Sequence, residues 1–201
     1  MHHRAYSRVV WRTILALFAM TAPATANFDL WLINEIYSNA DGSIQFIELF
    51  TSLDDQERLS GHVITSLQNP FLFETDLFTF ETANHFFLVG TVSYAAAPGA
   101  VAPDYTVPDN FFSVDANTIT YAGVDLVTFP SGGLPLDGML SIDRNLLTSP
   151  NSPTNFSAES GQVILTPEPS TVLLLAFGLA VLAAGRNHYR VKAPFPARQC
   201  F

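Results

Sequence analysis

The sequence predicts an all-β protein folded as a sandwich of two sheets, and three observations lead to this prediction. Eight or nine short apolar runs in the middle of the chain are separated by turn-forming residues. No stretch of this region has the apolar spacing of an amphipathic helix. The chain also holds seventeen Phe and six Tyr, which are residue types that fill β-rich cores.

The first two strands are expected to form a hairpin. Residues 30–37 (LWLINEIY) and 44–51 (IQFIELFT) are rich in branched and aromatic side chains. Between them, Asp41 and Gly42 form a dipeptide that favours a turn. We therefore expect these two segments to pair across a loop slightly longer than the tightest hairpin turn.

The later strands follow the same pattern of short apolar runs. One long interruption, residues 95–108, is expected to be irregular because three prolines and a glycine lie within it. The other strands are expected at residues 59–65, 77–80, 86–91, 118–122, 125–129, 139–142 and 162–166.

Acidic residues are concentrated in the middle of the chain. All eighteen lie between Asp29 and Glu168, where Arg58 and Arg144 are the only basic residues. The resulting charge of −16 suits an exported protein and disfavours nucleic acid as a partner, because phosphate backbones are repelled. The single cysteine, Cys200, is unable to form an internal disulfide or a cysteine-based metal cluster.

Residues 1–26 are expected to be a secretory signal peptide. Three arginines precede a short apolar run at residues 13–20, and Ala24 and Ala26 supply the small residues of a cleavage site. We expect cleavage after Ala26. The alternative of an uncleaved anchor is disfavoured because the apolar run is too short to cross about 30 Å of hydrocarbon.

The C-terminal region combines a short Pro-Glu-Pro sequence, an apolar run and a basic cluster. Residues 170–185 are expected to form a transmembrane helix, since an apolar run without a polar stripe suits lipid better than a protein core. The basic flank places residues 193–201 in the cytoplasm as a tail. The Pro-Glu-Pro residues are Pro167, Glu168 and Pro169, and the basic cluster is Arg186, Arg190 and Lys192.

This order of elements, over residues 167–192, resembles the PEP-CTERM sorting signal of Gram-negative bacteria. The resemblance implies that an exosortase, a membrane protease, recognises Pro167, Glu168 and Pro169 and cuts nearby. It also implies an intermediate in the inner membrane, followed by delivery of the domain to the cell surface or the medium. A permanent membrane anchor is the alternative fate.

The middle of the chain, residues 27–158, resembles the lamin-tail domain. The resemblance rests on Asn34-Glu35-Ile36, on residues 46–50 (FIELF) and on Leu59-Ser60-Gly61. It implies an immunoglobulin-like sandwich without catalytic residues. Residues 159–166 are then expected to be a last strand or a linker to the sorting signal.

Two carboxylates are the strongest polar candidates for a site. Glu35 and Glu48 fall in neighbouring predicted strands, and paired carboxylates perform acid–base and glycosidase chemistry. A structural role is favoured, because buried polar groups are normally engaged in hydrogen bonds. No metal site is expected at His62 or His85, which lack further ligands nearby. Weak calcium binding is left open by the loop aspartates Asp104, Asp109 and Asp115.

These features favour a protein without enzymatic activity, exported and sorted to the surface. The sorting signal suggests a role in adhesion or in the extracellular polysaccharide matrix. A glycan- or calcium-binding module held permanently in the membrane is the first alternative. A hydrolase that uses Glu35 and Glu48 is the second.

Overall fold

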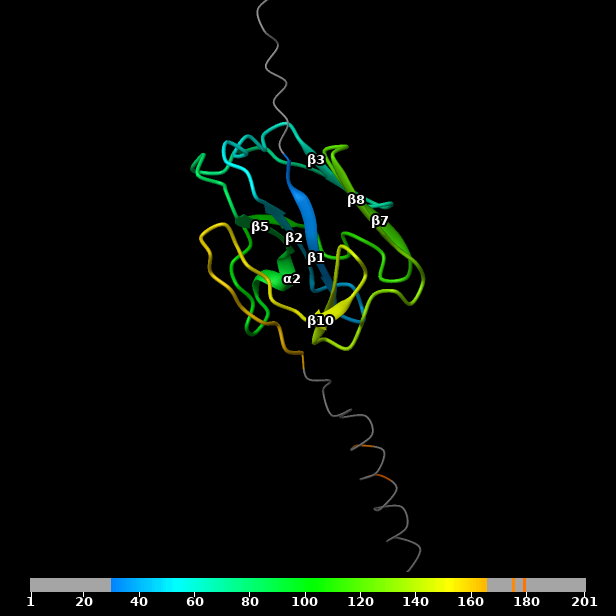
Figure 1. Cartoon of the computed structure of the whole chain (residues 1–201). Helices are drawn as coiled ribbons and strands as arrows, with labels where there is room; N and C mark the ends of the chain where they lie inside the picture. Colours follow the sequence, from blue (N-terminus) through cyan, green and yellow to red (C-terminus); the bar gives the residue numbers. More distant parts are fainter. Residues whose placement is uncertain (1–29, 166–174, 176–178, 180–201) are drawn as a thin grey trace, which may run out of the picture.

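The computed structural model of the chain describes residues 30–165 together with Leu175 and Leu179 (Figure 1). Residues 30–165 contain ten strands and one four-residue helix, α2 (Val92–Ala95). The strands form two sheets, so the prediction of an all-β protein with two sheets is confirmed.

The larger sheet has six strands. Its order is β10 (Thr148–Pro150), β9 (Leu140–Asp143), β1 (Leu32–Ser38), β2 (Gln45–Thr51), β5 (His85–Thr91) and β6 (Tyr105–Val107). The smaller sheet has the order β4 (Pro70–Leu72), β3 (Val63–Thr65), β7 (Asn117–Tyr121) and β8 (Asp125–Phe129). Neighbouring strands are antiparallel in both sheets, apart from β5 and β6, which are parallel.

The main hydrophobic core lies between the two sheets. Its centre is aromatic: the ring centroids of Trp31 and Phe87 are 4.7 Å apart in an edge-on arrangement, and those of Phe73 and Phe87 are 5.8 Å apart. Ile64 and Tyr121 reach the same core from the smaller sheet and are fully buried. This packing explains the abundance of phenylalanine in the sequence.

A second core covers the other face of the larger sheet. Tyr37, Phe46 and Leu88 point away from the main core and pack against Tyr94 of α2 and against Val163. Val163 belongs to residues 151–165, which we call the C-terminal strap and which run back and forth over this face. Both faces of β1, β2 and β5 are therefore buried, as the nearly continuous burial of β2 shows.

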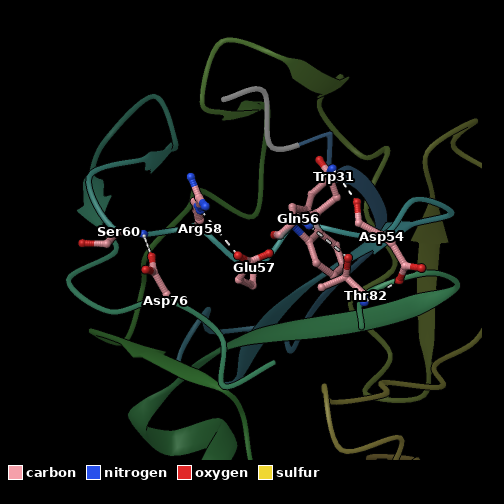
Figure 2. Close-up of polar contacts among 8 residues, drawn as sticks. All are labelled: Trp31, Asp54, Gln56, Glu57, Arg58, Ser60, Asp76 and Thr82. Carbon is pink, nitrogen blue, oxygen red and sulfur yellow. Dashed lines mark hydrogen bonds and ion pairs between the residues drawn. The ribbon is translucent and has the colours of Figure 1, made fainter. Parts of the chain in front are cut away.

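Polar contacts fix the loop between β2 and β3 (Figure 2). The indole Nε1 of Trp31 donates to the backbone oxygen of Gln56 at 2.8 Å. The backbone N–H of Gln56 donates to Thr82 Oγ1 at 3.1 Å, and the backbone N–H of Thr82 donates to Asp54 Oδ1 at 3.1 Å. This charged loop is therefore bound to the entrance of β1 and to the segment before β5.

Several predicted strands are confirmed and others are wrong. β1, β2, β3, β5, β7, β8 and β9 each fall within or overlap a predicted segment. The strand predicted at 77–80 is wrong: only Leu77 is buried there, and Phe78 and Phe80 are exposed. The strand predicted at 162–166 is also wrong for its described residues, which are extended but lie outside both sheets.

Three short strands were not expected. β4 and β10 have three residues each, and β6 lies inside the segment 95–108 that was predicted to be irregular. Each of them pairs with only one neighbour at the edge of a sheet. Strands this short have too few residues to show an alternating pattern, so pairing with a longer strand determines their conformation.

The predicted segments at the two ends are largely outside the described residues. This applies to the signal peptide at 1–26 and to most of the transmembrane helix at 170–185, of which Leu175 and Leu179 are described and helical. Among the residues that the structure describes, no helix has the length and apolar character needed to cross a membrane.

Candidate functional site: a buried carboxylate pair

Glu35 and Glu48 lie directly opposite each other on β1 and β2. They share the face of the larger sheet that the C-terminal strap covers, and only 6% and 2% of their surfaces are exposed. The register shifts by one residue between Ile33 and Glu35, so that Glu35 rather than Asn34 is paired with Glu48. A β-bulge at Asn34 therefore creates the carboxylate pair.

Hydrogen bonds from β9 and from the strap surround Glu35. Its Oε1 accepts from Ser141 Oγ at 2.5 Å and from the backbone N–H of Ser152 at 3.0 Å. Its Oε2 accepts from Ser152 Oγ at 3.3 Å. Glu35 thus joins the first residues of the strap to the sheet.

Glu48 is engaged in a similar way. Its Oε1 accepts from Asn34 Nδ2 at 2.7 Å, and its Oε2 accepts from the backbone N–H of Thr154 at 2.7 Å. All four carboxylate oxygens of the pair therefore accept hydrogen bonds from protein groups. The two glutamates thus bind the strap to the sheet. This is the structural role that is expected of buried polar groups.

Burial has an electrostatic consequence for this pair. Loss of solvent raises the pKa of Glu48 to about 7, and the nearby charge of Glu35 contributes in the same direction. Burial also raises the pKa of Glu35, although the hydrogen bonds from Ser141 and Ser152 oppose the shift. At neutral pH Glu48 therefore retains a proton in part of the molecules, whereas an exposed glutamate would be ionised.

An asparagine that the sequence analysis did not single out completes the anchoring of the strap. Asn151 Nδ2 donates to the backbone oxygens of Met139 and Val163, both at 2.7 Å. Its Oδ1 accepts from the backbone N–H of Val163 at 2.8 Å. Asn151 thus bridges the two arms of the strap. The Pro- and Ser-rich composition of residues 149–153 indicates a turn but does not indicate this bridge.

The loop aspartates are not gathered into a metal site. Asp104 is engaged by the backbone N–H groups of Leu88 and Phe156, at 2.8 and 2.9 Å, and burial raises its pKa. Asp109 accepts from Ser93, and Asp115 accepts from Ser131. Within residues 30–165, no group of three or more His, Cys, Asp or Glu is placed to hold a metal ion.

His62 and His85 both lie against aromatic rings of the domain. The ring of His62 lies 6.3 Å from the ring of Tyr121. Nδ1 of His85 is 3.1 Å from the backbone oxygen of Ala83, and its ring packs on Phe156. Both side chains are thus part of the packing of the domain.

The strap ends where the sorting signal begins. The backbone N–H of Leu165 donates to the oxygen of Gly138 at 3.1 Å, so the domain is packed up to this residue. The other predicted site residues lie outside the described part of the chain. They are Ala24 and Ala26, Pro167, Glu168 and Pro169, and Arg186, Arg190 and Lys192.

Comparison with known proteins identifies the C-terminal segment. Residues 165–188 match the PEP-CTERM protein-sorting motif, which includes Pro167, Glu168, Pro169 and Arg186. Arg190 and Lys192 lie beyond the end of the match. No curated protein and no solved structure matches the chain. The chain thus carries a PEP-CTERM sorting signal, which implies export and processing by an exosortase at the cell envelope.

Proposed function

We propose that this protein has no enzymatic activity and acts at the cell surface, in adhesion or in the extracellular polysaccharide matrix. The observation that carries the proposal is the PEP-CTERM match, which begins at the last residue of the folded domain. The acidic sandwich is then the cargo, and the sorting signal determines its destination. The engagement of all four oxygens of Glu35 and Glu48 supports this role over that of a carboxylate-dependent hydrolase.

The cargo is proposed to be a lamin-tail-like domain with an immunoglobulin-like sandwich. Two of the segments that carry the resemblance, Asn34-Glu35-Ile36 and residues 46–50, lie on the paired strands β1 and β2. The third, Leu59-Ser60-Gly61, forms the turn before β3. These segments thus meet at the centre of the larger sheet and at the entrance to the smaller one.

The proposed route begins at the inner membrane of a Gram-negative bacterium. The signal peptide is removed after Ala26, and residues 170–185 hold the exported chain in the membrane with residues 193–201 in the cytoplasm. Cleavage near Pro167–Pro169 then separates the domain from this anchor and leaves it at the cell surface or in the medium.

Replacement of Pro167, Glu168 and Pro169 by alanine is expected to block this cleavage in the native host. The wild-type chain should end near residues 167–170, as measured by mass spectrometry of the mature protein. The variant should keep Cys200 and Phe201 and should remain in the membrane fraction.

A matched control replaces Pro194 and Pro196, which lie beyond the sorting motif, and should be processed like the wild type. A wild-type chain that retains its C-terminal residues in the membrane fraction contradicts the proposal. Such a result identifies a permanent tail anchor instead.

One observation favours the alternative of a glycan-binding module. The outward-facing residues of the smaller sheet are uncharged, although the domain is acidic, and four of them are threonines. Thr65 shares a hydrogen bond with Thr120, and the hydroxyls of Thr118 and Thr128 are 2.9 Å apart. An exposed hydroxyl-bearing face without charge suits a neutral polysaccharide better than an anionic polymer.

Aspartate at Thr118 and Thr128 should abolish any binding of the protein to neutral glycans on an array, since the two charges face outward where the sugar would lie. Binding that survives these changes, or no binding by the wild type, argues against a glycan site on this face. A calcium-dependent version predicts that added calcium raises the Tm.

A further inference from the structure

The end of the domain from which the chain leaves is unusually apolar. The last residue of α2 and the loop that follows it, residues 95–103 (AAAPGAVAP), form a run of nine residues without a polar side chain. Most of this loop is exposed or half-buried. The loop lies where β5 ends, and the last described residues of the strap lie at the same end in Figure 1.

Backbone contacts connect this loop to the exit of the chain. The N–H of Gln162 donates to the oxygen of Gly99 at 3.1 Å, and a Cβ placed on Gly99 would lie 2.2 Å from the oxygen of Gln162. The N–H of Leu165 donates to the oxygen of Gly138 at 3.1 Å. The loop 95–103, the turn at Gly138 and the end of the strap thus form one continuous surface.

Apolar side chains extend this surface around Leu165. Leu136, Met139 and Ile164 are exposed by 38%, 48% and 48%. We call residues 95–103 with Leu136, Met139 and Ile164 the apolar exit surface. Asp137 lies beside these residues, and its carboxylate accepts from the backbone N–H groups of residues 139 and 140, both at 2.8 Å.

The opposite end of the sandwich has a different character. The loop that follows β2 carries Asp54, Asp55, Glu57 and Arg58 within five residues, and Glu81 lies before β5. Apolar residues that are exposed singly are ordinary on a soluble domain. Several exposed apolar side chains gathered at one end are not, and such a patch marks a contact with a partner or a membrane.

The length of chain beyond Leu165 indicates the partner. Four residues, 166–169, separate Leu165 from the expected start of the membrane helix at Ser170. Fully extended, they span at most about 14 Å. The headgroup layer occupies about 5 to 7 Å on each side of the hydrocarbon core. An anchored chain therefore places the apolar exit surface next to the lipid headgroups.

We propose that, before cleavage, the domain rests on the membrane through the apolar exit surface, which enters the headgroup layer of zwitterionic phospholipid. This inference depends on the proposed function, since it requires the membrane-anchored form. The contact holds Pro167–Pro169 at the membrane surface, where a membrane protease reaches them. Asp41 and Asp109 lie at the same end of the domain, so anionic lipid is the less suitable surface.

The covalent link to the membrane helix explains why such a small apolar surface is sufficient for contact with the membrane. A covalent link makes the contact intramolecular and raises the effective concentration of the surface at the membrane. Cleavage removes this advantage. The apolar exit surface alone is then too small to hold the domain on the membrane. Cleavage of the chain therefore also releases the domain from the lipid surface.

The test uses the full-length chain with Cys200→Ser and a single new cysteine that carries an environment-sensitive dye. The chain is inserted into phosphatidylcholine vesicles that contain a nitroxide-labelled headgroup lipid, which quenches dyes at the interface. A dye at Met139→Cys should lose most of its emission. A dye at Leu126→Cys, on the exposed face of the smaller sheet, should keep it.

A double variant, Leu136→Asp with Ile164→Asp in the Met139→Cys chain, tests the cause of the quenching. It shows whether quenching requires the apolar side chains or only the nearness of the membrane. The pair should restore the dye emission while the circular dichroism spectrum stays unchanged, because both side chains are partly exposed. Quenching that persists in this variant overturns the proposal, because the covalent link alone then accounts for it.

Flotation of the vesicles shows whether the chain is anchored in the membrane at all. A chain that fails to float with the vesicles contradicts the membrane-anchored form, and with it the proposed function. A chain that floats but whose Met139→Cys dye is not quenched leaves the proposed function intact and overturns this inference alone.

Discussion

Glu48→Gln is expected to stabilise the protein above pH 7 and to flatten the dependence of its stability on pH. Burial raises the pKa of Glu48 from 4.5 to about 7 in the folded protein, so the folded state holds this proton more tightly than the unfolded state does. The favourable contribution of the protonated carboxyl is complete below pH 4.5 and is lost as the pH rises to about 7. The loss amounts to roughly 3 kcal/mol of unfolding free energy.

Glutamine has the same shape and remains neutral over this range. It keeps one acceptor oxygen for Thr154, and a rotated Asn34 amide can accept from its new N–H₂ group. Urea denaturation between pH 4.5 and 8.5 should therefore give a flatter curve for the variant than for the wild type. The residual slope comes from Glu35 and Asp104, whose pKa values are also raised by burial.

Glu74→Gln is a matched control for the loss of one carboxylate, because Glu74 is exposed. Its curve should follow that of the wild type. If the curve of Glu48→Gln also follows the wild type at every pH, then Glu48 is ionised in the folded protein without cost, and the description of Glu48 as a buried carboxyl with a raised pKa is wrong.

Trp31→Ala is expected to lower the free energy of unfolding by about 3 to 5 kcal/mol, which is a large part of the stability of a domain this size. Trp31 is fully buried and packs edge-on against Phe87 and Phe156. Its removal leaves a cavity between the sheets and also leaves the oxygen of Gln56 without its donor. Urea denaturation followed by circular dichroism measures the change.

Two further variants separate the contributions to this effect. Trp31→Phe keeps much of the packing but loses the hydrogen bond to Gln56, so it should cost about 1 to 3 kcal/mol. Phe80→Ala removes an exposed ring and should change stability by about 0.5 kcal/mol or less. A loss below about 1 kcal/mol for Trp31→Ala would mean that Trp31 is not at the centre of the core.

The long strands could be predicted because their signals are local. Residues 44–51 and 125–129 have branched and aromatic side chains at the positions that form β2 and β8. The short strands could not, since the conformation of β4 and β6 depends on β3 and β5, which pair with them. The burial of both faces of the larger sheet also obscures the alternation from which the face of a strand is normally deduced.

The candidate site was predictable in part for the same reason. Alternation with apolar neighbours indicates that Glu48 is half-buried and engaged by the protein. It does not indicate the bulge at Asn34, which determines that Glu35 is its partner. The donors from Ser152 and Thr154 lie more than 100 residues away along the chain, so no local pattern indicates them. The sorting signal, by contrast, is a continuous sequence and can be recognised directly.

The position of the strap has a consequence for the order of events during export. A chain that is exported across a membrane from its N-terminus delivers β1, β2 and β5 long before residues 151–165. Until these last residues emerge, Glu35 and Glu48 lack their donors from the strap and the second core lacks Val163. We therefore expect folding to finish only when the sorting signal has itself entered the translocation channel, so that the complete domain first exists at the membrane.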